Sequence, residues 1–422
     1  MSTQENHLHL FQAFGIELEY MIVDIETLNV KPIADEVLKS LAGEITSDVT
    51  FGNVTWSNEL ALHVIELKCS APTGDLVQLA ADFEEAIQQM NSVLSEFKAQ
   101  LMPSAAHPWM DPETETVRWP HDNAEIYATY DRIFNCKGHG WSNLQSMHIN
   151  LPFHGDEEFA KLHAAIRVLL PIMPALSASS SILDGKDTGF WDKRLDYYRK
   201  NQKAVPMLTG QVIPEPVFTK ADYYAQIFDQ IAIDIKAHDP EGILEPIWLN
   251  SRGAIARFDR GAIEIRILDV QECPKADLAI ASLIIQTLKL LVDEFAMPLE
   301  TQKKFKTEGL ADIFKQVIRH GEHTLVQDVS YLKAFGLNAV NEITAIELWQ
   351  YIKRKIDRRY PKALEPWQDE IELIFDEGTL STRILNVLEA NLEHDNLKMV
   401  YSELCDCLEN NQMLRECLEE AF

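Results

Sequence analysis

Apolar and polar residues alternate in several short stretches of the first two thirds of the chain, and this period of two predicts β-strands. In FGIELEY (14–20), Glu17 and Glu19 alternate with three apolar residues. Successive side chains of a strand point to opposite faces, so the two glutamates share one face. Stretches of the same kind are NELALHVIELK (58–68), LQSMHINLPF (144–153) and GAIEIRILD (261–269).

A different spacing predicts helices. After Asp75, apolar residues recur at three- and four-residue steps as far as Phe97, which is typical of an amphipathic helix. Residues 103–124 are rich in Pro, His, Trp and Asp and are expected to form a loop. Further helices are expected over 156–170, over 222–238 and onward from Lys275.

The order of these elements favours the α+β class. Strands and helices do not alternate in a βαβ rhythm, so we predict an antiparallel sheet with helices on its outer face. From about Leu299 onward the pattern is helical and charged, and no strand is expected there. We therefore divide the chain into a sheet-containing domain over 1–298 and a helical C-terminal region over 299–422 that packs on it.

Composition and charge exclude several classes of partner. Of the 422 residues, 46% are hydrophobic, which is enough for a large core, and the formal net charge is −28. A surface this acidic repels phosphate backbones and anionic lipids, so neither nucleic acid nor a membrane is an expected partner. An anionic substrate would require local cations that reverse this field.

No stretch predicts a membrane span or a secretion signal. The start, MSTQENHLHL, lacks both a basic segment and an apolar run. The apolar stretch 276–292 is short and is interrupted by Asp277 and Lys289. Six cysteines are scattered without the spacing of a metal site or a disulfide framework. We expect a cytoplasmic protein with reduced thiols, and the sequence is compatible with a homo-oligomer.

The polar faces of the predicted strands carry carboxylates with one imidazole, one amide and one guanidinium. These residues are Glu17, Glu19, Glu59 (at the start of its strand), Glu66, His148, Asn150, Glu264 and Arg266. A solvated face is the simple alternative, because many antiparallel sheets have one wet side. Such a face usually mixes Thr, Ser and Lys with Glu. Clustered carboxylates without cysteine instead favour a hard divalent cation, Mg²⁺ before Zn²⁺.

Phosphate chemistry would need a special arrangement in this chain. It has no GxxxxGK[ST] P-loop and no GxGxxG motif after a strand. Arg266, beside Glu264, is the candidate to hold a phosphate group through two N–H donors. The stretch SASSSILDGKDTGFWDKRLDYYRK (177–200) joins small hydroxyl residues to Arg194 and other cations. It is compatible with anion binding, although a surface loop followed by a charged helix is the simpler interpretation of its composition.

Five of these stretches, taken in order, resemble glutamate–cysteine ligase family 2, which includes the bacterial carboxylate–amine ligases and belongs to the glutamine synthetase superfamily. They are FGIELEY, ELALHVIELKCSAPTG, QSMHINLPF, SASSSILDGKDTGFWDKR and GAIEIRILD, and they span roughly residues 11–295. The resemblance implies a curved antiparallel sheet with ATP and Mg²⁺ or Mn²⁺ on its concave face, and a catalytic ligase domain over 1–298. It also implies that a carboxylate, typically the γ-carboxylate of glutamate, is phosphorylated by ATP and that an amine attacks the acyl phosphate.

The resemblance also implies roles for particular residues. Arg266 would contact phosphate and act in catalysis with Glu264. Arg194 would lie in a nucleotide or substrate loop, and Gln145 and Asn150 would lie beside the substrate. Glutamate and cysteine are the expected substrates, as in glutathione biosynthesis, and small molecules are the expected partners. The metal ligands would be Glu17, Glu19, Glu59, Glu66, His148 and Glu264.

Two alternatives stay open. A phosphotransferase of the guanidino kinase type on a related sheet would need no amine and would accumulate a stable phosphorylated product. A non-catalytic relative would bind the nucleotide without turnover. In each case, like charges as close as those of Glu17 and Glu19 repel unless a cation or a proton lies between them.

Overall fold

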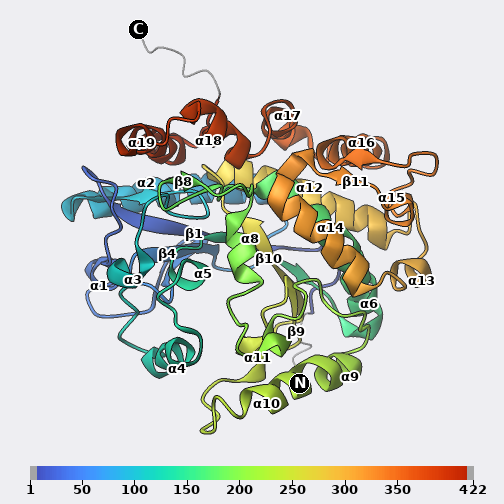
Figure 1. The fold of residues 1–422 in the computed structure, drawn as a ribbon, viewed down its shortest axis with the longest axis horizontal. Coiled ribbons are helices and arrows are strands. Elements are labelled where there is room, and N and C mark those ends of the chain that lie inside the picture. Colours follow the sequence, from blue (N-terminus) through green and yellow to red (C-terminus); the bar gives the residue numbers. More distant parts are fainter. Residues whose placement is uncertain (1–6, 416–422) are drawn as a thin grey trace.

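The polar and apolar stretches fold into a large antiparallel sheet surrounded by helices (Figure 1). The structure is a computed structural model, and it describes residues 7–415. Two short strand pairs, β7 (Ile182–Leu183) with β8 (Lys186–Asp187) and β11 (Leu325–Val326) with β12 (Ile343–Thr344), lie outside the large sheet. The strands of the large sheet are β1 (Gly15–Asp24), β2 (Asp48–Phe51), β3 (Val54–Asn58), β4 (Val64–Cys69), β5 (Ala99–Met102), β6 (Ser146–Pro152), β9 (Ala254–Arg257) and β10 (Ala262–Asp269).

The order of the strands in the sheet does not follow their order in the chain, and all of the pairings are antiparallel. Its strands lie in the order β2-β3-β4-β1-β6-β10-β9, and β5 pairs with the last residues of β1. Each neighbouring pair is antiparallel. Strands far apart in the chain, such as β1 and β6, are thereby brought side by side. The α+β class predicted from the sequence is confirmed.

Helices of very different length connect and cover these strands. Short 3-10 turns and a π-helical turn (Tyr224–Phe228) join some of them. Up to the end of the long central helix they are α1 (Ala34–Ala42), α2 (Leu76–Glu96), α3 (Pro112–Glu115), α4 (Ala124–Phe134), α5 (His139–Ser142), α6 (Gly155–Leu169), α7 (Pro174–Ser177), α8 (Lys193–Tyr198), α9 (Lys220–Tyr223), α10 (Asp229–Ile235), α11 (Pro246–Leu249) and α12 (Pro274–Val292). After it come α13 (Leu299–Gln302), α14 (Thr307–His320), α15 (Val329–Lys333), α16 (Ala345–Arg359), α17 (Gln368–Glu377), α18 (Leu380–Leu388) and α19 (His394–Asn410).

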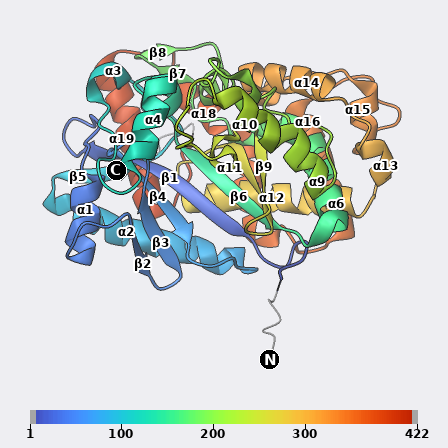
Figure 2. The same ribbon diagram turned by 90° about the horizontal axis from the view of Figure 1, so that it is seen from below.

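Helices α2 and α12 cover the apolar face of the sheet. The Asp75 side chain accepts a hydrogen bond from the backbone N–H of Gln78 and so begins α2, as an N-cap does. The apolar stripe of α2 is buried in the same core cluster as the inward residues of β1, Ile16 and Leu18. Nearly every side of α12 is buried, because this helix lies between the sheet and the C-terminal helices (Figures 1 and 2). The polar face of the sheet is left free of these helices.

The helices after residue 298 pack on the sheet-containing part of the chain. Helices α16 and α17 contact α12, and α19 contacts α2 and β5. The fully buried Arg383 on α18 forms an ion pair with Glu272, which lies between β10 and α12. This buried pair fixes α18 against the loop that follows β10. The division of the chain at residue 298 stays a prediction.

The structure corrects three local predictions. Residues 58–68 are not one strand, because β3 ends at Asn58 and β4 begins at Val64; Glu59 therefore lies in the connection between them. The expected loop over 103–124 contains α3 and leads into α4, which was not predicted. The C-terminal region contains the two-residue strands β11 and β12, which pair with each other. Within residues 7–415, no helix has the length and apolar character needed to cross a membrane.

Candidate active site

The candidate residues on the polar face form two rows that run across the strands. The first row places Lys68, Glu17 and His148 on β4, β1 and β6, because Glu17 pairs with Lys68 on one side and with His148 on the other. The second row places Glu66 opposite Glu19. Side chains that oppose each other on one face of a sheet lie about 4.5–5.5 Å apart at Cβ. The register itself therefore assembles the carboxylates.

Glu17 is held as an anion in the first row. Its Oε2 atom lies 2.9 Å from Nδ1 of His148, and its Oε1 atom accepts a 3.1 Å hydrogen bond from Nδ2 of Asn150. Burial opposes ionisation, but the His148 hydrogen bond and the charges of His148, Lys68 and Arg266 outweigh it and lower the pKa of Glu17 to about 2. Burial also opposes the charging of His148, and the hydrogen bond to Glu17 with the charge of Glu19 raises the pKa of that imidazole to about 9.

Glu19 and Glu66 are fixed by neighbours in the second row. Glu19 Oε2 accepts hydrogen bonds from the backbone N–H (2.7 Å) and the hydroxyl (3.1 Å) of Ser146. Glu66 Oε1 accepts hydrogen bonds from Lys68 Nζ (2.6 Å) and Ser57 Oγ (2.9 Å). Burial and the charge of Glu17 nevertheless raise the pKa of Glu66. The two carboxylates are thus held in fixed orientations, but the positive charge beside them does not balance their negative charge.

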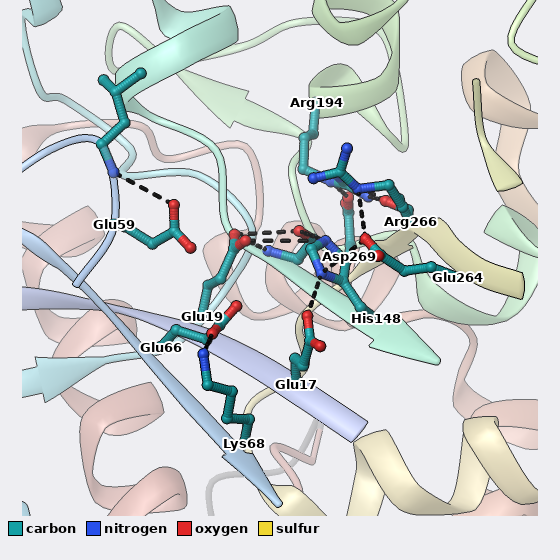
Figure 3. Close-up of polar contacts among 12 residues, drawn as sticks. Glu17, Glu19, Glu59, Glu66, Lys68, His148, Arg194, Glu264, Arg266 and Asp269 are labelled. Carbon is teal, nitrogen blue, oxygen red and sulfur yellow. Dashed lines mark hydrogen bonds and ion pairs between the residues drawn. The ribbon is translucent and has the colours of Figure 1, made fainter. Parts of the chain in front are cut away.

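Glu59 completes the acidic end of the site. From the connection between β3 and β4 it reaches toward Glu19 and Glu66 (Figure 3), and its Oε2 accepts a 3.3 Å hydrogen bond from the N–H of Leu60. Burial, followed by the charges of Glu19 and Glu66, raises the pKa of Glu59 to about 8. A carboxylate this hard to ionise among other carboxylates requires a proton or a cation beside it.

Two groups of ligand atoms fit a divalent cation. Glu17, Glu66 and His148 offer atoms within 4.8 Å of one another, and so do Glu19, Glu59 and Glu66. Glu66 belongs to both groups, so two ions would share it. A set of carboxylate oxygens with one imidazole and no thiolate suits Mg²⁺ or Mn²⁺. Among residues 7–415, no other cluster of this kind occurs.

Glu264 and Arg266 lie next to the first group, on β10. Glu264 Oε1 is 3.9 Å from Nδ1 of His148 and 2.9 Å from Nε of Arg266 (Figure 3). Burial opposes the charge of Arg266, but the carboxylate of Glu264 raises the pKa of this guanidinium above its ordinary value. Arg266 is therefore a permanent cation at the edge of the acidic cluster, as the sequence predicts for a phosphate contact.

Arg194 has a different setting from the one predicted. It lies in helix α8 rather than in a loop, and its side chain is buried. Its Nε donates to Asp269 Oδ1 at 2.5 Å, and its two Nη atoms lie 3.3 and 3.4 Å from the carbonyl oxygen of Arg266. Asp269 also accepts hydrogen bonds from Ser179 and Ser180, which belong to the small-hydroxyl stretch. Arg194 thus supports the strand that carries Arg266.

Gln145 does not join the site. It precedes Ser146 on β6 and lies on the side of Met147, away from His148; it is fully buried. Its amide atoms have no hydrogen-bond partner among the described residues. It is not among the residues that line either cavity described below. The structure therefore does not bring Gln145 into the site, and its place beside the substrate stays a prediction.

Two cavities flank the carboxylates. We call the first the aromatic cavity; it has a volume of about 250 Å³. Its lining combines the charged residues Glu19, Glu59, His148, Arg194 and Arg266 with the aromatic residues Tyr127, Tyr130, Trp141, Tyr198 and Trp248.

We call the second the basic cavity; it has a volume of about 650 Å³ and lies beyond Asn150. Its lining includes His154, Lys220, Phe258 and Arg260, together with Asp156 and Asp259. Asp259 is paired with Arg257 at 2.8 Å and more loosely with Arg260, at 3.9 Å. Asn150 lines this cavity and also bonds to Glu17, so the carboxylates separate the two spaces.

Several residues of the site were missed in the sequence. Ser146, Lys68 and Asp269 orient the predicted residues. Strand parity signals Ser146 and Lys68, whereas Asp269 has the parity of the apolar Ile265 and Ile267, and a register shift after Ile265 interrupts the alternation. Helix α4 carries Tyr127, Tyr130 and Phe134, whose three- and four-residue spacing would have identified it. Trp141 and Trp248 lie on four-residue helices, which leave no periodic pattern.

Known proteins are similar to this chain over most of its length. An uncharacterised protein of Archaeoglobus fulgidus is 33% identical over 400 residues, covering 94% of this chain and 99% of the relative. A protein of Arthrobacter sp. named "Putative glutamate--cysteine ligase 2-1" is 23% identical over 68% of this chain and 69% of its own.

Solved structures share the fold. Glutamate–cysteine ligase from Francisella tularensis, solved with AMP, superposes with a TM-score of 0.64 at 13% identity, covering 94% of this chain and 90% of that one. A bifunctional glutathione synthetase from Pasteurella multocida gives a TM-score of 0.66 at 12% identity, covering 95% of this chain and 53% of the other.

The family model for glutamate–cysteine ligase family 2 (GCS2) matches residues 13–402, nearly the whole chain. The match extends through the C-terminal helices, well past residue 295, where the resemblance noted in the sequence ends. The chain belongs to glutamate–cysteine ligase family 2 and is an ATP-dependent ligase of the carboxylate–amine class.

Proposed function

We propose that the protein uses ATP and Mg²⁺ or Mn²⁺ to join the γ-carboxylate of a glutamate-like acid to an amine through an acyl phosphate. The observation that carries the proposal is the pair of carboxylate groups that share Glu66, with Arg266 beside them and a cavity on each side. Two anions react in such a transfer, so their charges must be neutralised and their atoms aligned.

The basic cavity suits the nucleotide. Its volume of about 650 Å³ lies in the range of ligand pockets, whereas the aromatic cavity of about 250 Å³ is small for a nucleotide. Lys220 and Arg260 supply positive charge in a chain of net charge −28, and Phe258 offers a ring face. From there the triphosphate would extend past Asn150 toward Glu17 and Glu264.

The aromatic cavity suits the acid. Arg266 and Arg194 line this cavity, and Arg266 also lies beside Glu264 and the first carboxylate group. A divalent cation bound by Glu17, Glu66 and His148 would neutralise phosphate oxygens of ATP. The γ-phosphate would then lie between the two cavities, facing the carboxylate of the acid.

The reaction has two balanced steps. An oxygen of the substrate carboxylate attacks the γ-phosphorus, the bond to the β-phosphate oxygen breaks, and ADP leaves. Arg266 donates N–H bonds to the transferring phosphoryl oxygens, where charge develops in the transition state. The amine nitrogen then attacks the acyl carbon, phosphate leaves with the electron pair of the C–O bond, and the amine loses one proton to form the amide.

Hydroxylamine provides a direct test of the acyl phosphate. The protein is incubated with ATP, Mg²⁺, glutamate and hydroxylamine, and both γ-glutamyl hydroxamate and ADP are measured. We expect the two products in equal amounts, and none when ATP, metal or glutamate is omitted. Cysteine, the amine of the family name, is the reference acceptor in parallel reactions.

Two results would contradict the proposal. A stable phosphorylated product without hydroxamate would indicate a phosphotransferase. ATP binding without any ADP release, with every acid and amine supplied, would indicate a non-catalytic relative. Glu264→Gln supplies the matched inactive control, because it keeps the side-chain shape but removes the charge beside Arg266 and His148.

A further inference from the structure

A further arginine reaches the polar face of the sheet from its edge strand. Arg257, the last residue of β9, lies opposite Ala262 in the register of β9 and β10. Residues that oppose each other across a ladder share a face, and so do residues two apart on one strand. Because Ala262 precedes Glu264 by two residues, Arg257 lies on the face that carries Glu264.

The guanidinium of Arg257 is held in one orientation by Asp259. Its Nε and Nη2 atoms donate to the two carboxylate oxygens of Asp259, at 3.1 and 2.8 Å. The remaining nitrogen, Nη1, lies 3.9 Å from Oε2 of Glu264, which is beyond hydrogen-bond distance. Within residues 7–415, Nη1 of Arg257 makes no hydrogen bond. The side chain is only 15% exposed, so a largely buried cation keeps N–H donors available to a ligand.

Glu264 lies between this arginine and Arg266. Its Oε1 atom is 2.9 Å from Nε of Arg266, and its Oε2 atom faces Nη1 of Arg257. Arg266 lines the aromatic cavity, whereas Arg257 leads directly into the turn 258–261, whose residues line the basic cavity. Arg257 therefore lies between the cavity that suits the nucleoside and the place proposed for the γ-phosphate.

Cations outnumber carboxylates on this side of Glu264. Asp259 lies between Arg257 and Arg260, so one carboxylate faces two guanidinium groups. Asp259 is also 45% exposed, and water weakens its interaction with both. Lys220 has no carboxylate within ion-pair distance in the part of the chain that the structure describes, and Asp156 accepts a hydrogen bond from its backbone N–H at 2.9 Å. A phosphate group would therefore meet a local excess of positive charge.

We propose that Arg257 contacts the β-phosphate of the bound nucleotide through Nη1 and stabilises the charge of the leaving ADP. This inference rests on the proposed function and on the place of the nucleoside in the basic cavity. When the bond from the γ-phosphorus to the bridging oxygen breaks, its electron pair stays on the β-phosphate of ADP. A fixed guanidinium beside this phosphate lowers the free energy of the transition state. Asp259 is a positioning residue, because it sets the plane of the Arg257 guanidinium.

Nucleotide affinity tests the contact without any turnover. The Kd values of AMP and of ADP are measured by calorimetry with Mg²⁺ on the full chain. We expect Arg257→Gln to raise the Kd of ADP at least tenfold and that of AMP less than twofold, because AMP has no β-phosphate. Arg257→Lys keeps the charge and should raise the Kd of ADP by a smaller factor. Arg199→Gln, at an arginine that donates twice to Asp196 and lines neither cavity, is the control and should change neither value.

Two binding results would overturn the inference. An unchanged Kd of ADP in Arg257→Gln would mean that the β-phosphate does not contact this residue. An equal loss of affinity for AMP and ADP would assign Arg257 to the nucleoside or to the fold of the β9–β10 turn. An AMP affinity that stays normal shows at the same time that the cavity of the variant is intact.

Turnover gives the second readout. At saturating ATP, Arg257→Gln should lower kcat for hydroxamate formation at least tenfold, because charge develops on the leaving phosphate in the transition state. The KM for glutamate should change less than twofold. A normal kcat in this variant would overturn the role in stabilising the leaving ADP.

The two proposals fail in different ways, and the same pair of measurements separates them. Loss of ADP affinity in Arg257→Gln, without hydroxamate from the unaltered protein, would contradict the acyl phosphate and leave the phosphate contact standing. Hydroxamate from the unaltered protein, with the same ADP affinity in Arg257→Gln, would overturn the contact and leave the ligase mechanism standing.

Discussion

Glu19 and Glu66 oppose each other directly across β1 and β4, so two carboxylates share one cross-strand pair on the polar face of the sheet. Like charges in this position destabilise a sheet by roughly 0.2–1 kcal/mol. Each carboxylate accepts hydrogen bonds, from Ser146 and from Ser57 and Lys68, that orient it toward the other. The arrangement lowers the stability of the metal-free protein and provides a site that suits cations.

Glu19→Gln should therefore stabilise the metal-free protein by about 0.5 kcal/mol while weakening its response to metal. The amide oxygen can still accept from Ser146, so the shape is kept. Melting temperatures measured with chelator and with Mn²⁺ check this, with Glu96→Gln at an exposed position of α2 as the control. A variant that melts lower in chelator, yet keeps the full shift with Mn²⁺, would mean that Glu19 has a structural role.

Arg266→Lys should lower kcat for hydroxamate formation by about 10²–10³-fold. Lysine can keep the ion pair with Glu264 but cannot offer the planar pair of N–H donors to a phosphoryl group. The melting temperature should change little. Arg199→Lys, at a part-exposed ion pair with Asp196, is the control. Near-normal turnover in Arg266→Lys would exclude the phosphate contact.

Asp269→Asn should destabilise the protein by about 3–5 kcal/mol, because it leaves the buried Arg194 guanidinium without its carboxylate. Urea unfolding at neutral pH measures this change. Asp312→Asn removes the partner of Lys315 at the surface and should cost less than about 1 kcal/mol. Equal effects of the two substitutions would show that the Arg194 pair is not a structural support of β10.

Three histidines buried away from the carboxylates predict the pH dependence of stability. Burial lowers the pKa of His63 to about 4 and that of His107 to about 3. Burial and the charge of Arg167 lower the pKa of His163 to about 3. Because these folded-state values lie below the unfolded value of about 6.5, their stabilising contribution is complete above pH 6.5 and is lost as the pH falls toward 4.

His163→Phe isolates one of these groups. His163 packs among Phe159, Phe218 and Tyr223, so a phenyl ring suits its surroundings. The loss of unfolding free energy between pH 7 and pH 5 should be smaller in this variant by about 2 kcal/mol. Urea midpoints across this range measure it, with exposed His320→Phe as the control. A pH dependence identical to that of the unaltered protein would contradict the assignment.

The sequence predicted the sheet and its polar face because strand parity is a local property. Glu17, Glu19, His148 and Glu264 alternate with aliphatic residues, and the fold places them on one surface as expected. The partner of Glu17 was not predictable, because the pairing with His148 joins residues far apart in the chain. That ion pair keeps the carboxylate of Glu17 ionised although Glu19 lies two residues away on the same face.

Other parts of the site depend on contacts that no local pattern reports. Gln145 lies one position before Ser146, and a single step along a strand reverses the face. Arg194 owes its burial to Asp269 and to the hydroxyl groups beside it, from separate segments. The four-residue helices with Trp141 and Trp248 meet α4 only in three dimensions.

The central claim is that the carboxylates of the sheet hold divalent cations between a nucleotide and an acid. Anomalous scattering from crystals grown with Mn²⁺ and a non-hydrolysable ATP analogue tests it most directly. We predict strong peaks between Glu17, Glu66 and His148 and between Glu19, Glu59 and Glu66, with the analogue's triphosphate against the first. Bound analogue with no manganese peak at either group would contradict the claim.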